Sequence, residues 1–140
     1  MDDTDRRLIA LLRENARLPV ATLAQMLGLS RGTVQNRIDR MVAQGDVLGF
    51  TLRLRPEAEP HRIRAITLIA VEGERTDAVL RTLRGLPEVQ SIHTTNGRWD
   101  LVAELATDSL AAFDRALQRI RLIRGIAGTE TSLLLSTLKL

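Results

Sequence analysis

Apolar residues recur at helical spacing in three short segments at the start of the chain. They stand at positions 8, 11 and 12, at 20, 23, 24 and 27, and at 34, 38 and 41. Each set lies on one side of a helix with 3.6 residues per turn. Thr4 and Ser30 are residue types that cap helix N-termini, and Gly28 suits the left-handed conformation that ends a helix. The pattern predicts three helices, the second and third joined by the break Gly28-Leu29-Ser30.

A different period follows these helices. The second half of residues 47–55 alternates between apolar positions (50, 52 and 54) and polar ones (51, 53 and 55). A period of two predicts a β-strand, which would form a wing beside the helices or lead into a second domain. Residues 56–62 are polar and contain two prolines, so we expect a linker there.

From residue 63 the pattern alternates between strands and helices. Apolar, β-rich runs at 63–71, 89–95, 99–105 and around 131–138 predict strands. Helical stripes predict helices at 77–86 and from Leu110 to Ile120, the second capped by Asp108 or Ser109. The order βαββαβ is that of a ferredoxin-like unit. The predicted fold class is α+β: a winged helix-turn-helix domain at 1–55, a linker at 56–62, and a ferredoxin-like βαββαβ domain at 63–140.

Composition narrows the class of protein. The 140 residues are 44% hydrophobic and include no cysteine, which excludes disulfides and thiolate metal sites. No apolar run reaches the roughly 18 residues of a membrane helix, and the acidic start MDDTDRR lacks a signal-peptide core. We therefore expect a cytoplasmic protein with no membrane partner. The net charge of +3 arises within residues 1–55, where nine arginines face six acids. This imbalance favours an anionic partner for that part.

The predicted third helix has the side chains that DNA recognition needs. Arginine can bind guanine with two hydrogen bonds and asparagine can bind adenine in the same way, while amides at the helix N-terminus suit a phosphate. A glycine at position 32 would allow close approach to the DNA backbone. The candidate DNA-binding residues are Ser30, Arg31, Gly32, Thr33, Gln35, Asn36, Arg37 and Arg40, with Arg53 on the predicted strand. An ordinary solvated helix face, or a helix pair used for protein contacts, is the alternative.

The segment DRRLIALLRENARLPVATLAQMLGLSRGTVQNRIDRMVAQGDVLGF resembles the DNA-binding domain of the Lrp/AsnC, or feast/famine, family. The shared elements are D-x-x-L-I-x-x-L, N-A-R, L-A-x-x-x-G-L-S and V-x-x-R-I-x-R-M. NGRWDLVAEL and GIAGTETSLLL resemble the family's βαββαβ ligand-sensing domain. The resemblance implies a sequence-specific transcriptional regulator that binds double-stranded DNA and responds to a small-molecule effector, commonly an amino acid. It also implies dimers formed through the C-terminal domains and higher rings such as octamers.

The resemblance also implies an effector site. Gly97 and Asp100 match the family's ligand turn, where a glycine permits the turn and a carboxylate can hold the ammonium group of an amino acid. Further matching positions are Trp99, Leu110, Thr131, Ser132, Leu133 and Leu134. The family often has an acid followed by Tyr or Phe where Arg98 and Trp99 stand, which leaves the ligand's identity open. The alternative is a hairpin turn in which Asp100 caps local amides and Trp99 packs at an interface.

An enzyme of the same architecture is a further alternative. Sirohaem decarboxylases of haem biosynthesis resemble the same family but carry a motif like W-P-Y-N-L, whereas this chain has RWDLV and no tyrosine. His93 lies near that segment, although a single strand histidine is more often structural. His61 and His93 are far apart and lack clustered carboxylates, so we expect no metal, no cofactor and no catalysis.

Overall fold

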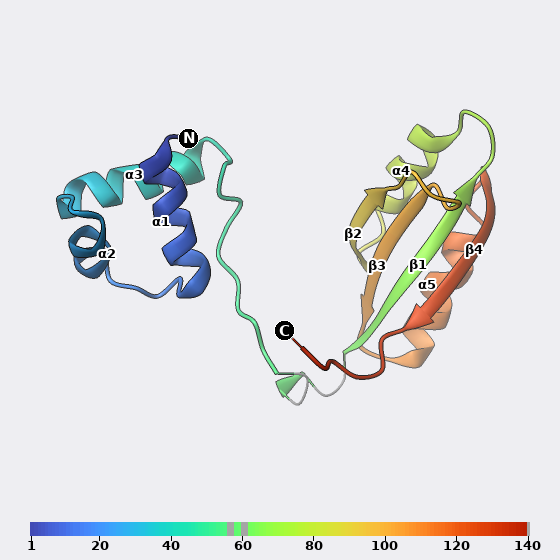
Figure 1. The fold of residues 1–140 in the computed structure, drawn as a ribbon. Helices are drawn as coiled ribbons and strands as arrows, with labels where there is room; N and C mark the ends of the chain where they lie inside the picture. The colour runs from blue at the N-terminus through green and yellow to red at the C-terminus, as the bar shows by residue number, and fades with distance from the viewer. Residues whose placement is uncertain (56–57, 60–61, 140) are drawn as a thin grey trace. The chain divides into compact units, whose positions relative to one another are not determined.

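The computed structural model describes residues 1–55, 58–59 and 62–139, and the chain divides into two compact units, Met1–Arg53 and Leu54–Leu140 (Figure 1). The expected linker at 56–62 includes 56–57 and 60–61, which lie outside the described residues. Within the described part of the chain, no helix has both the length and the apolar character needed to cross a bilayer.

The first unit consists of the three predicted helices, α1 (Asp3–Glu14), α2 (Val20–Leu27) and α3 (Arg31–Ala43). They enclose a small apolar core in which each helix buries its predicted stripe. The fully buried members are Leu8, Leu23, Ala24, Val34 and Met41. Three short helices offer little apolar surface, so the stability of this unit depends on nearly all of these core contacts.

Local cap chemistry sets the helix boundaries. Gly28 has φ of 67° and closes α2, and the Ser30 hydroxyl accepts the Thr33 N–H to open α3, as predicted. The prediction that Thr4 caps α1 is wrong. Asp2 is the N-cap, and it forms a capping box in which its side chain accepts the Asp5 N–H while the Asp5 side chain accepts the Asp2 N–H. The two carboxylates accept hydrogen bonds from two free backbone amides, whereas the hydroxyl of Thr4 could satisfy only one.

The strand predicted at residues 47–55 is absent from the structure. No described segment forms a ladder with this stretch, and Leu48, Phe50, Leu52 and Leu54 are all exposed. The alternation is real, but a β-strand forms only where a neighbour accepts its backbone hydrogen bonds. The prediction of a wing strand within this chain is therefore wrong.

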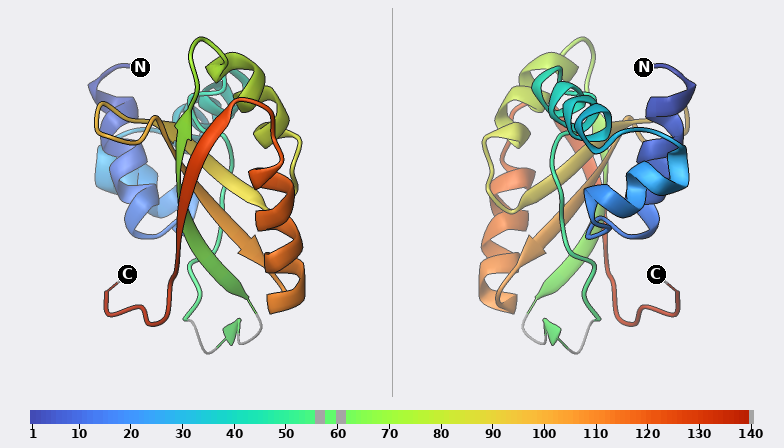
Figure 2. Two further views of the ribbon diagram at one scale, coloured as in Figure 1. Left: turned by 90° about the vertical axis from the view of Figure 1, so that its right-hand side faces the viewer. Right: turned by 90° about the vertical axis from the view of Figure 1, so that its left-hand side faces the viewer.

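The second unit has the predicted βαββαβ order. Its elements are β1 (Ile63–Val71), α4 (Thr76–Arg84), β2 (Val89–Thr94), β3 (Leu101–Thr107), α5 (Leu110–Arg121) and β4 (Ile126–Leu133). The strands form one antiparallel sheet in the order β2-β3-β1-β4. Figure 2 shows α4 and α5 on the same face of this sheet.

The last strand lies further upstream than predicted. β4 begins at Ile126 rather than near Thr131, and it ends at Leu133. Gly128 lies inside this strand, where it pairs with Ala70 beside a shift in the register between β1 and β4. Glycine is common at such irregular points inside strands, so it does not mark the strand end here.

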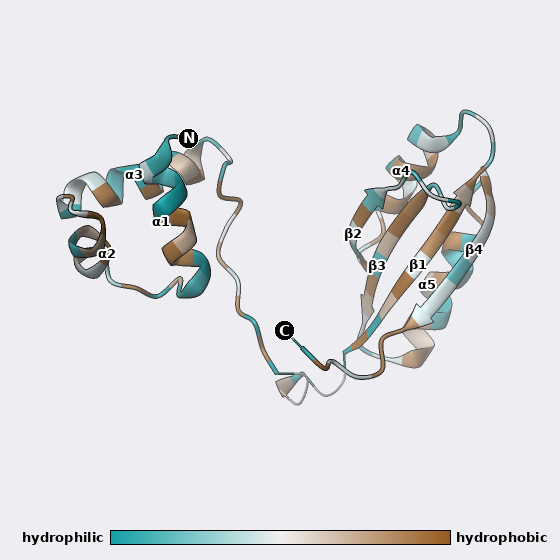
Figure 3. Ribbon diagram, in the orientation of Figure 1, coloured by the Kyte–Doolittle hydropathy of each residue, from teal (hydrophilic) through white to brown (hydrophobic). Residues whose placement is uncertain are grey.

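Each inner strand has one buried row of side chains. Residues 65, 67 and 69 of β1 and residues 101, 103, 105 and 107 of β3 are buried beneath the two helices. Figure 3 shows the hydrophobic positions on these two strands. The alternate rows, which include Ile66, Leu68 and Val102, are half-buried on the face that neither α4 nor α5 covers.

Candidate nucleic-acid interface and effector residues

The N-terminal half of α3 presents an open, polar surface. Arg31, Gly32, Thr33, Gln35 and Asn36 are all exposed. A Cβ built on Gly32 would meet no atom within 4 Å, so the backbone is accessible at the first turn. Helix N-termini carry free amides and a positive dipole end, so this turn can accept a phosphate.

Two other predicted DNA-binding residues of α3 are held in ion pairs with α1. Arg37 Nη1 donates to Asp2 Oδ2 at 2.7 Å and to Asp5 Oδ1 at 2.8 Å. Arg40 Nη2 donates to both oxygens of Asp5, at 2.9 and 2.8 Å. Asp5 is only 1% exposed. We call Asp2, Asp5, Arg37 and Arg40 the Asp–Arg cluster. It joins the start of α1 to the middle of α3, a link between residues 32 to 35 positions apart that no local sequence signal could reveal.

The Asp–Arg cluster makes the first unit sensitive to acid. Hydrogen bonds from Arg37 lower the pKa of Asp2 from 3.8 to about 2, and the Asp2 backbone bond together with Arg37 lowers that of Asp5. A carboxyl whose pKa is lower in the folded state stabilises the fold above its unfolded pKa and loses that contribution as the pH falls through the folded value. We expect the melting temperature of α1–α3 to change little from pH 7 to 5 and to fall between about pH 4 and 2. Circular dichroism melts test this, and an unchanged melting temperature down to pH 2 would contradict it.

The predicted effector turn is fastened to β1. Asp100 Oδ2 accepts the Val71 N–H at 2.7 Å, and the Asp100 N–H donates to the Ile69 carbonyl at 2.9 Å. Within the turn, the Thr95 hydroxyl donates to the Trp99 carbonyl, and the Arg98 guanidinium stands 5.6 Å from the centre of the Trp99 ring. Asp100 thus caps an amide of β1, 29 positions away in the sequence, rather than an amide of its own turn, while its side chain remains exposed.

Gly97 does not need the conformational freedom of glycine. Its φ lies outside the positive range, and a Cβ there would come no closer than 3.9 Å to the Thr95 hydroxyl. The turn itself therefore does not depend on glycine at this position, and a role of Gly97 in close approach by a ligand stays a prediction.

The predicted effector residues fall into two groups at opposite ends of the sheet. Leu133 pairs with Ala65, and the Leu134 N–H donates to the Arg64 carbonyl, whereas Asp100 is bonded to Val71. Six residues of β1 separate these points, or about 20 Å at 3.3 Å per residue. Leu110 opens α5 just after β3, which ends opposite Ile63. One chain therefore does not bring both groups around a single small ligand.

The strand group also divides between the two sheet faces. Thr131 Oγ1 lies 3.0 Å from Thr67 Oγ1, whose residue is buried on the face beneath the helices. Ser132, the next residue, pairs with Ile66 and belongs to the uncovered face. Thr131 thus has a structural partner already, while Ser132 is exposed.

Two family models match the chain along most of its length. Residues 1–42 match the AsnC-type helix-turn-helix domain, and residues 64–140 match the Lrp/AsnC ligand binding domain. The chain belongs to the Lrp/AsnC family. This Lrp/AsnC protein is a helix-turn-helix transcriptional regulator with a ligand-binding domain, and the decarboxylase alternative is not favoured.

Similar proteins span the whole of this Lrp/AsnC chain. The HTH-type transcriptional regulator FL11 of Pyrococcus furiosus is 29% identical over 139 residues, covering 99% of this chain and 92% of its own. Among solved structures, E. coli AsnC is 25% identical with a TM-score of 0.81 and covers 100% of this chain and 95% of its own. The leucine response regulatory protein LrpA of Mycobacterium tuberculosis is 31% identical with a TM-score of 0.82, over 99% and 95% of the two chains.

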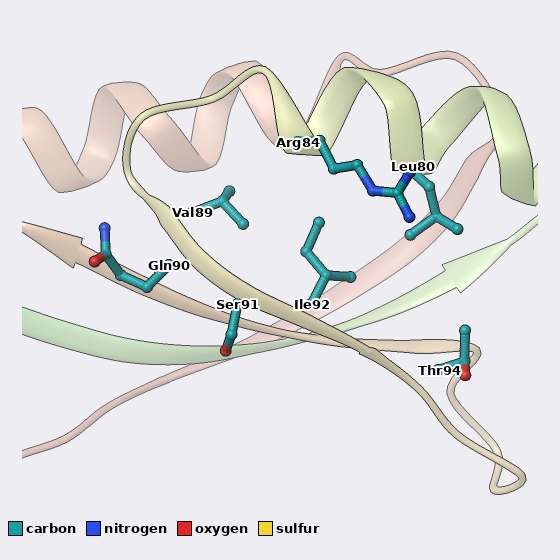
Figure 4. Close-up of a pocket in the computed structure, with 7 residues that line it drawn as sticks. All are labelled: Leu80, Arg84, Val89, Gln90, Ser91, Ile92 and Thr94. Carbon is teal, nitrogen blue, oxygen red and sulfur yellow. The ribbon is translucent and has the colours of Figure 1, made fainter. Parts of the chain in front are cut away.

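The Lrp/AsnC domain also has a hollow of about 400 Å³ between α4 and β2 that the sequence did not predict. In Figure 4, Val89 and Ile92 point toward α4, whereas Ser91 points away, where its hydroxyl donates to Glu104 at 3.1 Å. Leu80, Arg84, Gln90 and Thr94 complete the lining. None of the eight predicted effector residues lines it.

His93 is exposed on β2 and pairs with Val102, while His61 lies outside the described residues. Among the described residues, no three His, Asp or Glu side chains are grouped so as to hold a metal ion.

Proposed function

We propose that this regulator reads double-stranded DNA with the N-terminal half of α3. The observation that carries the proposal is the exposed face of that half-helix, where Gln35 and Asn36 stand next to the open first turn at Gly32. Amide side chains can bind adenine with two hydrogen bonds, and the free amides of the first turn can bind a phosphate. Arg31 adds a positive charge beside this phosphate position.

The other predicted DNA contacts take different parts in this proposal. Arg53 is exposed beyond the helices and suits a phosphate contact, which carries no sequence information. Ser30 acts through its cap on α3 and Thr33 through its bond to Ser30. The ion pairs to Asp2 and Asp5 give the side chains of Arg37 and Arg40 a structural role. That these two residues also contact DNA stays a prediction.

Selection from a random duplex library tests the proposal and yields a preferred site. We then expect Asn36→Ala to weaken binding to that site by about 1–3 kcal/mol, roughly fivefold to 150-fold, because one bidentate base contact is lost. Binding to unrelated DNA should change little. Gln118→Ala, which removes an exposed amide from α5, is the matched control. Selection that enriches no sequence, or equal loss on all DNA in Asn36→Ala, would contradict the proposal.

We further propose that the effector is an amino acid bound at a site shared by two copies of the chain. The separation of Asp100 from Leu133 and Leu134 supports a shared site, because only a second copy can bring the two groups together. Asp100 Oδ1 has no protein donor among the described residues, so this oxygen is available to an ammonium group. The 31%-identical relative named a leucine response regulatory protein supports the ligand class.

A dimer would use the uncovered face of the sheet. Ile66, Leu68 and Val102 form its apolar centre, and the polar residues Glu104 and Ser132 lie on either side of Ile66. Sheet faces with an apolar centre are stabilised by packing against a second layer. Effector sites between dimers would then build a larger ring such as an octamer.

A further inference from the structure

The Asp–Arg cluster contains two carboxylates and two guanidinium groups, so its formal charge is zero. Asp2 and Asp5 on α1 neutralise Arg37 and Arg40, which are two of the three arginines of α3. The third, Arg31, has no salt bridge among the described residues. Helix α3 therefore offers less positive charge to DNA than its three arginines suggest.

Charge balance determines how a side chain contributes to DNA binding. Non-specific affinity arises from basic groups that neutralise phosphates and release counterions. An arginine already paired with a carboxylate releases fewer counterions, and a phosphate that approaches Arg37 also approaches the carboxylate of Asp2, whose side chain is 55% exposed. Both effects weaken the contact of Arg37 with a phosphate.

We infer that Asp2 and Asp5 are positioning residues that withhold Arg37 and Arg40 from the DNA phosphates. They hold α3 against α1 and, by keeping its charge low, reduce binding to unrelated DNA. Discrimination among sequences then depends on the neutral side chains at Gln35 and Asn36. This inference rests on the proposed DNA-binding function of α3, and it adds how the protein limits non-specific binding.

Asp2→Asn in the full chain is the test. Asparagine caps a helix as well as aspartate does, so the bond from the Asp5 N–H can remain. Arg37 then loses one of its two carboxylate partners and keeps Asp5, and the Asp–Arg cluster gains one net positive charge. We expect the slope of log affinity against log salt on random duplex DNA to steepen by about 0.9, and non-specific affinity at 0.1 M salt to rise about eightfold. Affinity for the selected site should rise less, so the specificity ratio falls.

Asp3→Asn provides a matched control. It adds the same charge one residue away, but among the described residues Asp3 pairs only with Arg6, at 3.0 Å, on the exposed side of α1. We expect its salt slope to match that of the unaltered protein. In a background carrying Arg37→Gln, Asp2→Asn should produce no steepening, because the guanidinium that Asp2 neutralises is no longer present. Circular dichroism melts of each variant are the check that α1–α3 remain folded.

Three outcomes would overturn the inference. The first is equal steepening in Asp2→Asn and Asp3→Asn, which would show only a global charge effect. The second is an unchanged slope in folded Asp2→Asn, and the third is steepening that persists in the Arg37→Gln background. The unaltered protein separates the two levels of the argument: if it prefers no sequence, the proposed function fails, whereas clear preference with any of these outcomes rejects the inference alone.

Discussion

Replacing Gly125 with alanine is expected to lower the free energy of unfolding of the ligand-binding domain by about 3 kcal/mol. Gly125 has φ of 101°, a conformation that is costly for a residue with a side chain. A Cβ there would lie 2.9 Å from Arg75 Cβ and 3.3 Å from Val79 Cγ2, so α4 would have to move. Overpacking of this kind costs about 1–3 kcal/mol in addition to the backbone strain.

The sequence offers a matched control at Gly128. Its φ is not in the positive range, and a Cβ built on it would meet nothing within 4 Å. We expect Gly125→Ala to lower the melting temperature of the domain by about 10–20 °C and Gly128→Ala to change it by only a few degrees. Hydrogen exchange should show protection lost in β1 and β4 but kept in α1–α3. Equal melting temperatures for the two variants would contradict this account.

Replacing Asp100 with asparagine is expected to abolish the response to an amino-acid effector while leaving the fold intact. Asparagine keeps a side-chain oxygen for the Val71 N–H that Asp100 now accepts at 2.7 Å, but it removes the negative charge that would hold an ammonium group. Loss of one partner from a buried charge pair costs about 2–5 kcal/mol, or at least about thirtyfold in affinity. Asp100→Ala would remove both the acceptor for the Val71 N–H and the negative charge, so it should also destabilise the turn.

A thermal-shift screen of the twenty amino acids would first identify a stabilising ligand, and calorimetry would then compare the variants. Asp114→Asn is the control, because it removes an exposed carboxylate from α5, on the face of the sheet opposite the proposed dimer face. We expect ligand-free DNA binding close to normal in Asp100→Asn and in the control. Unchanged effector affinity in Asp100→Asn would show that Asp100 is only a cap and that the ligand binds elsewhere.

Most features set by neighbours in sequence were predicted, although the capping box of Asp2 and Asp5 at the start of α1 was not. Gly28 and Ser30 determine the turn between α2 and α3 through their own conformation and bonds, and β1 has the predicted bounds. Features set by distant partners were not. Gly128 lies inside β4 because Ala70 pairs with it, and residues 47–55 form no strand because no described segment pairs with them.

The candidate sites follow the same rule. Family motifs and helical spacing predicted a DNA-binding face on α3, which stays a prediction, but gave no sign that Arg37 and Arg40 are attached to carboxylates more than thirty positions away. The motif that includes Asp100 gave no indication of its bond to Val71 or of its distance from Leu133. Such pairings depend on how the elements pack, which a single sequence does not state.

The order of the strands has a consequence for how the protein is made. The sheet places β4 beside β1, so Thr67 cannot form its contact with Thr131 until 64 further residues have been synthesised. The three helices of the first unit, by contrast, are complete once residue 43 has left the ribosome tunnel. Domains generally fold as units from the N-terminus during translation, and distant strand pairing is slow. A nascent chain should therefore fold its helix-turn-helix unit well before its ligand-binding domain is complete. Translation that stops between α3 and β4 would leave a folded DNA-binding unit without a ligand-binding domain to regulate it.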